Sequence, residues 1–254
     1  MPAGAVPVEL FVSRWGRGAR GALLIHGLGS ASSTWWRVAE AVAGEGFAVA
    51  APDLRGHGLS PRATSYGIDA LVTDLLELGG GWEVAVGHSL GGLLAARAAV
   101  DDPGFAAALV LLDPVFEIPA ERFEEVVAEQ VDEVARPLDA EAILRANPRW
   151  HPEDAANKAR AVRMTSPYVV ERILRDNAPW SFAHVAQALV VPTMILGADP
   201  GVGGLLDPRL GERLAAGNPR ISFRVVAGAA HSIQREEPGV VLDAVRSLVG
   251  QLHR

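Results

Sequence analysis

The chain of 254 residues contains no cysteine, and this absence excludes several kinds of chemistry. A protein without thiols has no disulfide, no thiolate metal site and no cysteine nucleophile. Lysine is almost as scarce, because Lys158 is the one lysine among 23 basic residues. Together with the abundance of alanine and glycine, this scarcity indicates a compositional bias, and we draw no function from it.

Neither a block of basic residues nor a long apolar run is present. The net charge is −7, from 30 acidic and 23 basic residues, which argues against nucleic acid or an anionic membrane as the main partner. No segment approaches the roughly 18 apolar residues of a membrane span, and the first residues lack the basic and apolar regions of a secretion signal. We therefore expect a cytoplasmic protein, a monomer or a homodimer, that acts on a small molecule.

The most informative stretch runs from Trp82 to Gly92 and reads WEVAVGHSLGG. Its first half is typical of a buried strand, and the segment 90–100, rich in alanine and leucine, is typical of a helix. The residues between them match the G-x-S-x-G nucleophile elbow. Small neighbours let the strand and the helix approach closely, while Ser89 is held in a strained conformation. Ser89 is therefore the candidate nucleophile, and the N–H of Leu90 is a candidate donor to an oxyanion.

Strands and helices alternate along most of the chain. Further segments typical of strands stand at 22–25, 47–51, 107–112, 192–196 and 221–226. Helical segments between them predict an α/β protein with a parallel sheet and helices on both faces, and residues 8–15 predict an outer antiparallel strand. Ligands bind such sheets at the carboxyl ends of the strands. The groups expected at those ends are Ser89, Asp113, Asp199, His231 and the glycine loop 26–30.

No strand-like run occurs between about residues 117 and 182. Four polar helical segments, punctuated by prolines, fill this stretch instead. We expect a helical cap of residues 117–182, inserted between two strands of a core that consists of residues 1–116 and 183–254. Aromatic residues of both parts are candidates for lining a substrate pocket, although each alone is equally consistent with a place in the core. They are Trp35, Trp36, Phe116, Trp150 and Trp180.

Taken in order, the segments HGLGS, DLRGHGLS, GHSLGG, ADP and GAAHS resemble the α/β-hydrolase superfamily, in particular its lid-bearing esterases and lactonases. The resemblance extends over nearly the whole chain and implies an α/β-hydrolase fold. It implies that Ser89 is the nucleophile, that His231 is the general base and that a carboxylate orients His231. It also implies that Leu28, in loop 26–30, supplies a second oxyanion donor beside Leu90. This chemistry requires no metal and no cofactor.

Two aspartates compete for the role of the carboxylate that orients His231. Relatives commonly place this residue three positions after the glycine that ends a strand, whereas Asp199 stands two positions after Gly197. Asp113 ends the preceding strand, and some lid-bearing relatives, the haloalkane dehalogenases among them, supply the acid from that position. We favour Asp199 and keep Asp113 as the alternative.

The other histidines in the glycine-rich loops are interpreted as parts of the loop architecture. They are His26, His57 and His88.

The function that these features favour is hydrolysis of a carboxylic ester or lactone of a small, largely apolar substrate through an acyl-enzyme on Ser89. A second hypothesis uses the same triad for C–C bond hydrolysis, for perhydrolysis, or for a lyase or cyclase step in secondary metabolism. In that case arginines of the cap would bind a substrate carboxylate, with Arg145, Arg149 and Arg163 as candidates. A third hypothesis is a ligand receptor without turnover, and the intact Ser89 and His231 count against it.

Overall fold

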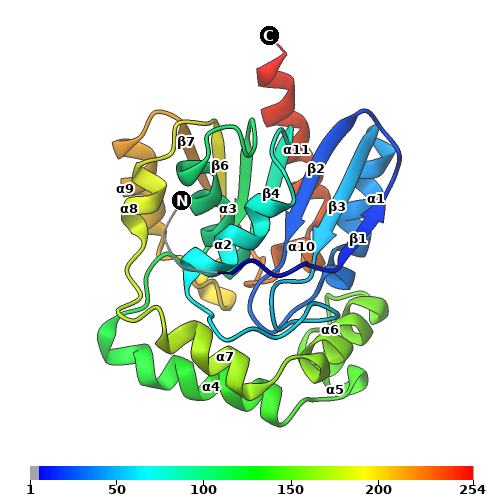
Figure 1. Ribbon diagram of the computed structural model, residues 1–254, viewed down its shortest axis with the longest axis vertical. Helices are drawn as coiled ribbons and strands as arrows, with labels where there is room; N and C mark the ends of the chain where they lie inside the picture. The colour runs from blue at the N-terminus through cyan, green and yellow to red at the C-terminus, as the bar shows by residue number, and fades with distance from the viewer. Residues whose placement is uncertain (1–5, 254) are drawn as a thin grey trace.

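A seven-stranded sheet forms the centre of the computed structural model, which describes residues 6–253 (Figure 1). The strands lie in the order β1-β3-β2-β4-β5-β6-β7. Only β1 is antiparallel to its neighbour, and the other pairs are parallel. Their bounds are β1 Val12–Trp15, β2 Arg20–Ile25, β3 Phe47–Pro52, β4 Val84–His88, β5 Leu109–Leu112, β6 Thr193–Ala198 and β7 Ile221–Val226. The predicted α/β class, with its parallel sheet and outer antiparallel strand, is confirmed.

Side chains of the central strands alternate between two apolar layers. In β2, Leu23 and Ile25 pack into one layer and Ala22 and Leu24 into the other, because successive residues of a strand point to opposite faces. Burial on both faces explains why these strands are continuous apolar runs in the sequence. The first layer is covered by α2 (Ile68–Glu77), α3 (Leu90–Asp101), α8 (Ala183–Gln187) and α9 (Pro208–Gly217), and the second by α1 (Trp36–Gly44) and α11 (Pro238–Leu252).

Four helices lie together across the end of the sheet to which the strand arrows point (Figure 1). They are α4 (Phe123–Ala135), α5 (Ala140–Ala146), α6 (Pro152–Met164) and α7 (Pro167–Arg175). Prolines open α6 and α7, at the start of the helix, where the N–H groups have no acceptor within the helix and a missing one removes no hydrogen bond. Arg175 of α7 pairs with Glu124 of α4 as well as with Glu171 of its own helix. These helices occupy the segment predicted as the cap.

The chain enters and leaves this helical layer at one place. The N–H of Ile118 donates to the carbonyl oxygen of Trp180, and the N–H of Phe182 donates to the carbonyl oxygen of Phe116. The inserted helices are therefore attached through two neighbouring segments that are bonded to each other.

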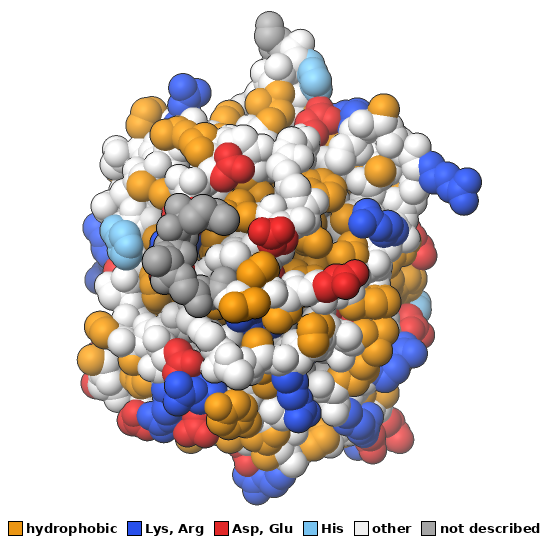
Figure 2. Space-filling view, in the orientation of Figure 1, with side chains coloured by type: hydrophobic (Ala, Val, Ile, Leu, Met, Phe, Trp, Pro, Cys, Tyr) orange, Lys and Arg blue, Asp and Glu red, His pale blue; other side chains and the backbone are white. Residues whose placement is uncertain are grey.

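Acidic and basic side chains are mixed over the face of the molecule shown in Figure 2, and no block of one sign covers it. Within residues 6–253, no helix combines the length and the apolar character that crossing a membrane requires.

Candidate active site

Ser89 occupies the turn between β4 and α3, and its backbone is strained. Its φ of 55° and ψ of −119° lie where residues with a side chain rarely stand. A Cβ on Gly87 would lie 2.3 Å from the carbonyl oxygen of Gly91, and a Cβ on Gly91 would lie 2.2 Å from the carbonyl oxygen of Ile25. The two glycines therefore permit the close crossing of strand and helix that places Ser89 at the end of the sheet.

His231 follows β7, and its ring is hydrogen-bonded to Asp113. The Nδ1–H group of His231 donates to Oδ2 of Asp113 at 2.6 Å. Because Nδ1 carries the proton, Nε2 of the neutral ring is left as an acceptor, which is the form that a general base needs. Asp113 follows β5 with a φ of 40°, so that it and Ser89 are the two non-glycine residues with positive φ among those described. Backbone strain is thus concentrated at this site.

Three backbone N–H groups hold the carboxylate of Asp113 in addition to His231. Ala198 and Leu206 donate to Oδ1 at 3.0 and 3.1 Å, and Leu205 donates to Oδ2 at 2.8 Å. Burial by itself raises the pKa of Asp113, but the hydrogen bond and charge of His231, with these N–H groups, bring that pKa below its ordinary value. Asp113 is therefore an ionised carboxylate at neutral pH.

Asp199 lies elsewhere, and the expectation that it would be the carboxylate beside His231 is corrected. Its Oδ1 accepts the N–H of Gly201 at 2.8 Å, and its Oδ2 accepts the N–H of Gly228 at 2.8 Å. These two hydrogen bonds lower the pKa of Asp199. The physical reason is the short 3₁₀ turn Pro200–Val202, which begins directly after Asp199 and uses its carboxylate as a cap.

The two expected oxyanion donors, Leu28 and Leu90, line the same cavity as Ser89 and His231. Leu90 is the first residue of α3, so its N–H has no acceptor within the helix. Among the described residues, Ser89 Oγ has no hydrogen-bond partner. Catalytic hydrogen bonds often tighten only when substrate binds.

The loop that carries Leu28 is held by two buried histidines. Nε2 of His57 accepts the N–H of Gly29 at 3.2 Å, and Nε2 of His26 accepts the N–H of Leu54 at 3.0 Å. Burial lowers the pKa of His57 to about 3, so this ring is neutral and available as an acceptor at neutral pH. Both histidines occupy the architectural positions that the sequence suggested.

His88 contacts His231 directly. Its Nε2–H donates to the carbonyl oxygen of His231 at 2.9 Å, and the two ring centroids are 4.6 Å apart. Burial, followed by the charge of His231, lowers the pKa of His88 well below its ordinary value. A neutral His88 therefore positions the backbone of His231 and adds no positive charge beside it.

A cavity of about 400 Å³ lies between the strand ends and the inserted helices. Part of its wall is apolar and consists of Val115, Ile118, Leu138, Leu174, Trp180 and Leu205. Leu138 and Leu205 are 56% and 58% exposed, so the cavity opens to solvent beside them. A volume of this size suits a small organic molecule.

Of the aromatic residues expected to line a pocket, Trp150 and Trp180 do so. The expectation is wrong for the other three. Trp35 and Phe116 are 1% and 0% exposed and pack in the two apolar layers of the sheet. Trp36 turns its ring N–H to Asp154 of α6 at 2.8 Å, which joins the start of α1 to the inserted helices. An aromatic side chain near a strand end thus has several apolar surfaces available to it, and the cavity is one of them.

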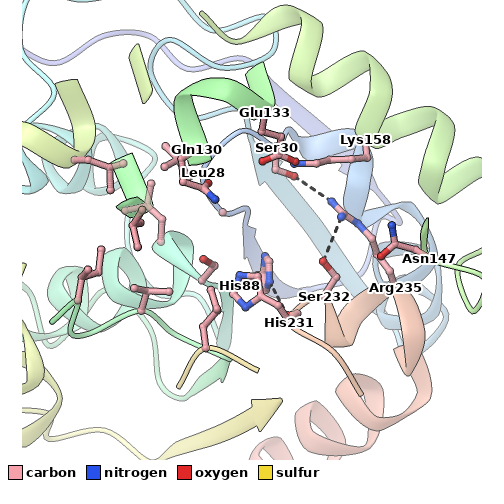
Figure 3. Close-up of a pocket in the computed structure, with 18 of the residues that line it drawn as sticks. Leu28, Ser30, His88, Gln130, Glu133, Asn147, Lys158, His231, Ser232 and Arg235 are labelled. Carbon is pink, nitrogen blue, oxygen red and sulfur yellow. Dashed lines mark hydrogen bonds and ion pairs between the residues drawn. The ribbon is translucent and has the colours of Figure 1, made fainter. Parts of the chain in front are cut away.

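A second part of the cavity wall is polar and was not predicted from the sequence. Figure 3 shows Ser30, Glu133, Lys158, Ser232 and Arg235 around it. Lys158 of α6 pairs with Glu133 of α4 at 2.7 Å and donates to the carbonyl oxygen of Gly29 at 3.2 Å. The one sequence signal for this cluster was the solitary lysine, which was attributed to composition.

The cap arginines considered for substrate binding do not line this cavity. Arg145 pairs with Glu141 on its own helix, Arg149 pairs with Glu237, and Arg163 donates to the carbonyl oxygen of Ala159. Within residues 6–253, no group of three or more His, Cys, Asp or Glu side chains is arranged to hold a metal ion.

Residues 22–244 match the model of the alpha/beta hydrolase family. The chain belongs to this family. The hydrolase is 29% identical over 261 residues to the esterase Rv0045c of Mycobacterium tuberculosis, across 93% of this chain and 85% of that protein. Lipase LipV of the same organism is 42% identical over 125 residues, and the match spans about half of either protein, 47% of each.

A solved esterase structure is also similar to this hydrolase. The thermophilic esterase from Thermogutta terrifontis, solved with malate bound, is 25% identical with a TM-score of 0.78, over 97% of this chain and 95% of that one. Relatives named esterase and lipase support ester hydrolysis in general as the activity of this hydrolase.

Proposed function

We propose that this hydrolase cleaves small carboxylic esters, lactones included, through an acyl-enzyme on Ser89. The observation that carries the proposal is the 2.6 Å hydrogen bond from His231 to the buried Asp113, beside the strained Ser89. A histidine whose Nδ1 proton is held by a carboxylate presents Nε2 as a base and is stabilised when it becomes charged.

In the proposed mechanism Ser89 Oγ attacks the ester carbonyl while Nε2 of His231 takes its proton. The N–H groups of Leu28 and Leu90 bind the developing oxyanion. His231 then gives its proton to the departing alcohol, which leaves an acyl-enzyme. Water attacks the acyl group with His231 again as base, and Ser89 is restored. Asp113 keeps the same tautomer of His231 throughout.

The substrate is proposed to bind in the 400 Å³ cavity, with its apolar part against the wall formed by Ile118, Leu174 and Trp180. A cytoplasmic location, and assembly as a monomer or a homodimer, stay predictions.

The proposal is tested with a fluorophosphonate probe and with a panel of p-nitrophenyl esters of short and medium chain length, together with a few lactones. We expect the wild-type protein to be labelled and to turn over members of the panel. Ser89→Ala loses labelling and lowers kcat by about 10⁴-fold or more. Ser222→Ala, an exposed serine on β7, is the matched control and behaves as the wild type. A folded wild-type protein that is neither labelled nor active would refute the proposed function.

A further inference from the structure

Arg235 is a buried cation that has no carboxylate partner among the described residues. It lies four positions after His231 and is 3% exposed. Its Nη1 and Nη2 groups reach only the hydroxyl oxygens of Ser232 and Ser30, at 3.3 and 3.5 Å, and its Nε–H is buried without a partner. The guanidinium also stacks on the ring of Trp150, 4.4 Å from the centroid. Its donors are thus mostly unused in a wall of the cavity (Figure 3).

Arg55 of the same protein shows what a structural buried arginine looks like. It is 1% exposed, and its Nε and Nη2 groups both donate to the carboxylate of Asp74 at 2.6 Å. Its remaining donors reach the carbonyl oxygens of Ser65 and Ala70 at 2.8 and 3.0 Å. A buried charge is costly unless it is paired and hydrogen-bonded, and Arg55 meets both conditions. Arg235 has no carboxylate partner among the described residues and makes only two long hydrogen bonds, which indicates that its partner is a ligand.

The two carboxylates whose charges act on Arg235 are already paired with other cations. Glu133 pairs with Lys158 at 2.7 Å, and Asp154 pairs with Arg37 at 3.3 Å. Burial lowers the pKa of Arg235 to about 10, against the opposing charges of Asp154 and Glu133, so the guanidinium is still charged at neutral pH. This corner of the cavity therefore keeps one positive charge that nothing in the described chain neutralises.

We propose that Arg235, with the hydroxyl groups of Ser30 and Ser232, binds a carboxylate of the substrate that is separate from the ester to be cleaved. The inference rests on the proposed function and narrows it, because the substrate becomes an ester with an anionic end. A guanidinium offers parallel N–H donors that match the two oxygens of a carboxylate. The apolar wall of the cavity then takes the rest of the molecule.

This anion site also positions the ester. Arg235 and Ser232 follow His231 in the same short segment, and Ser30 ends the loop that carries Leu28. The two ends of the substrate are therefore held by the segments that carry the general base and an oxyanion donor. Binding energy from the remote carboxylate would orient the ester carbonyl at Ser89.

The test compares two substrates that differ in charge at the remote end, mono-4-nitrophenyl glutarate and its neutral methyl ester. The uncatalysed hydrolysis of each ester, which is faster for the anionic one because its carboxylate attacks its own ester, is measured and subtracted. We expect the wild-type protein to have a kcat/KM about 10- to 100-fold higher for the anionic ester, the range of a charge-assisted hydrogen-bonded pair. Arg235→Met removes this preference, because its kcat/KM for the anionic ester falls to that for the neutral ester. Arg235→Lys keeps the positive charge but lacks the parallel N–H donors of the guanidinium, and it retains part of the preference. Arg145→Met is the matched control and keeps the preference, because Arg145 lies on the outside of α5 and pairs with Glu141.

The outcomes that overturn the inference are equally definite. A wild-type protein without preference for the anionic ester contradicts it, and this comparison needs no variant to fold. An Arg235→Met variant that is folded by circular dichroism and loses activity on both esters equally would assign Arg235 a structural role.

A binding experiment separates this inference from the proposed function. Calorimetry with glutarate and with the neutral glutaramide is carried out on Ser89→Ala, which cannot form an acyl-enzyme. We expect glutarate to bind, glutaramide to bind at least about 10-fold more weakly, and the added Arg235→Met change to abolish the difference. Glutarate binding to Ser89→Ala, together with a wild-type protein that the fluorophosphonate does not label, would support the anion site and refute the esterase. Labelling of the wild-type protein without any glutarate selectivity in Ser89→Ala would support the esterase and refute the anion site.

Discussion

The neighbouring strands β5 and β6 both end in an aspartate, and the two aspartates have opposite surroundings. Asp113 is 0% exposed, has a φ of 40°, and is bonded to His231 and to three backbone N–H groups. Asp199 is partly exposed, has a φ of −74°, and is bonded to two loop N–H groups. A place at the carboxyl end of a strand is therefore insufficient to make a carboxylate part of the site.

The two aspartates are nevertheless linked through one segment of chain. Asp199 caps the turn that starts the segment 199–206, and the last two N–H groups of that segment, from Leu205 and Leu206, donate to Asp113. Asp199 shapes the loop, and the loop holds the carboxylate that faces His231.

The largest expected effect is that of Asp113→Asn. An amide at this position no longer holds the required tautomer of His231, and we expect kcat to fall by about 10⁴-fold. The measurement is ester turnover per mole of protein, with folding checked by circular dichroism. Near wild-type turnover in this variant would show that Asp113 is not the carboxylate that orients His231 in the mechanism.

A smaller effect is expected from Gly204→Ala, which disturbs the loop and leaves both aspartates in place. A Cβ on Gly204 would lie 2.6 Å from the carbonyl oxygen of Ala198, so the segment that donates to Asp113 must move. We expect kcat to fall by about 10-fold and the free energy of unfolding to fall by about 1–3 kcal/mol. Gly217→Ala is the control, because no atom lies within 4 Å of the added Cβ there. An unaltered kcat in Gly204→Ala would show that the N–H groups of Leu205 and Leu206 are dispensable.

The pH dependence of the free energy of unfolding is a further test of the role of Asp113. Because the pKa of folded Asp113 lies below the value of 3.8 for an unperturbed carboxyl, the unfolded chain binds this proton more readily. The stabilisation that ionised Asp113 gives to the folded protein is complete above the unperturbed pKa of 3.8. It is lost as the pH falls through the lower pKa of folded Asp113. Between about pH 5 and pH 3, the free energy of unfolding measured in urea should therefore fall less for Asp113→Asn than for the wild type. An equal fall in both proteins would contradict the assignment of an ionised Asp113.

The smallest effect is expected from Asp199→Asn. Its carboxylate contacts only backbone N–H groups of Gly201 and Gly228, and an amide oxygen can replace one of these acceptors. We expect kcat to remain that of the wild type in the same ester assay. A loss comparable to that of Asp113→Asn would mean that turnover needs the carboxylate of Asp199, either at His231 or through the loop that holds Asp113.

Much of this molecule follows from local sequence patterns. The strand, turn and helix around Ser89, the alternation that gives a parallel sheet, and the four proline-punctuated helical segments are all visible in the sequence. The reason is that apolar periodicity, glycine and proline act over a few neighbouring residues, and a buried parallel strand is apolar on both faces wherever it occurs. The positions of Ser89 and His231 at the strand ends follow from the same patterns.

The tertiary structure decided the rest, because the deciding contacts join residues far apart in the chain. The partner of His231 depends on a loop some ninety residues after Asp113 that donates its N–H groups there. Nothing in the local sequence of Trp35 or Phe116 shows whether the side chain packs in the core or lines the cavity. Arg55 and Arg235 are both buried arginines. Only their spatial neighbours show that Arg55 is paired with a carboxylate and that Arg235 is paired with none within residues 6–253. Sequence determined which groups reach the end of the sheet, and three-dimensional packing determined which of them meet.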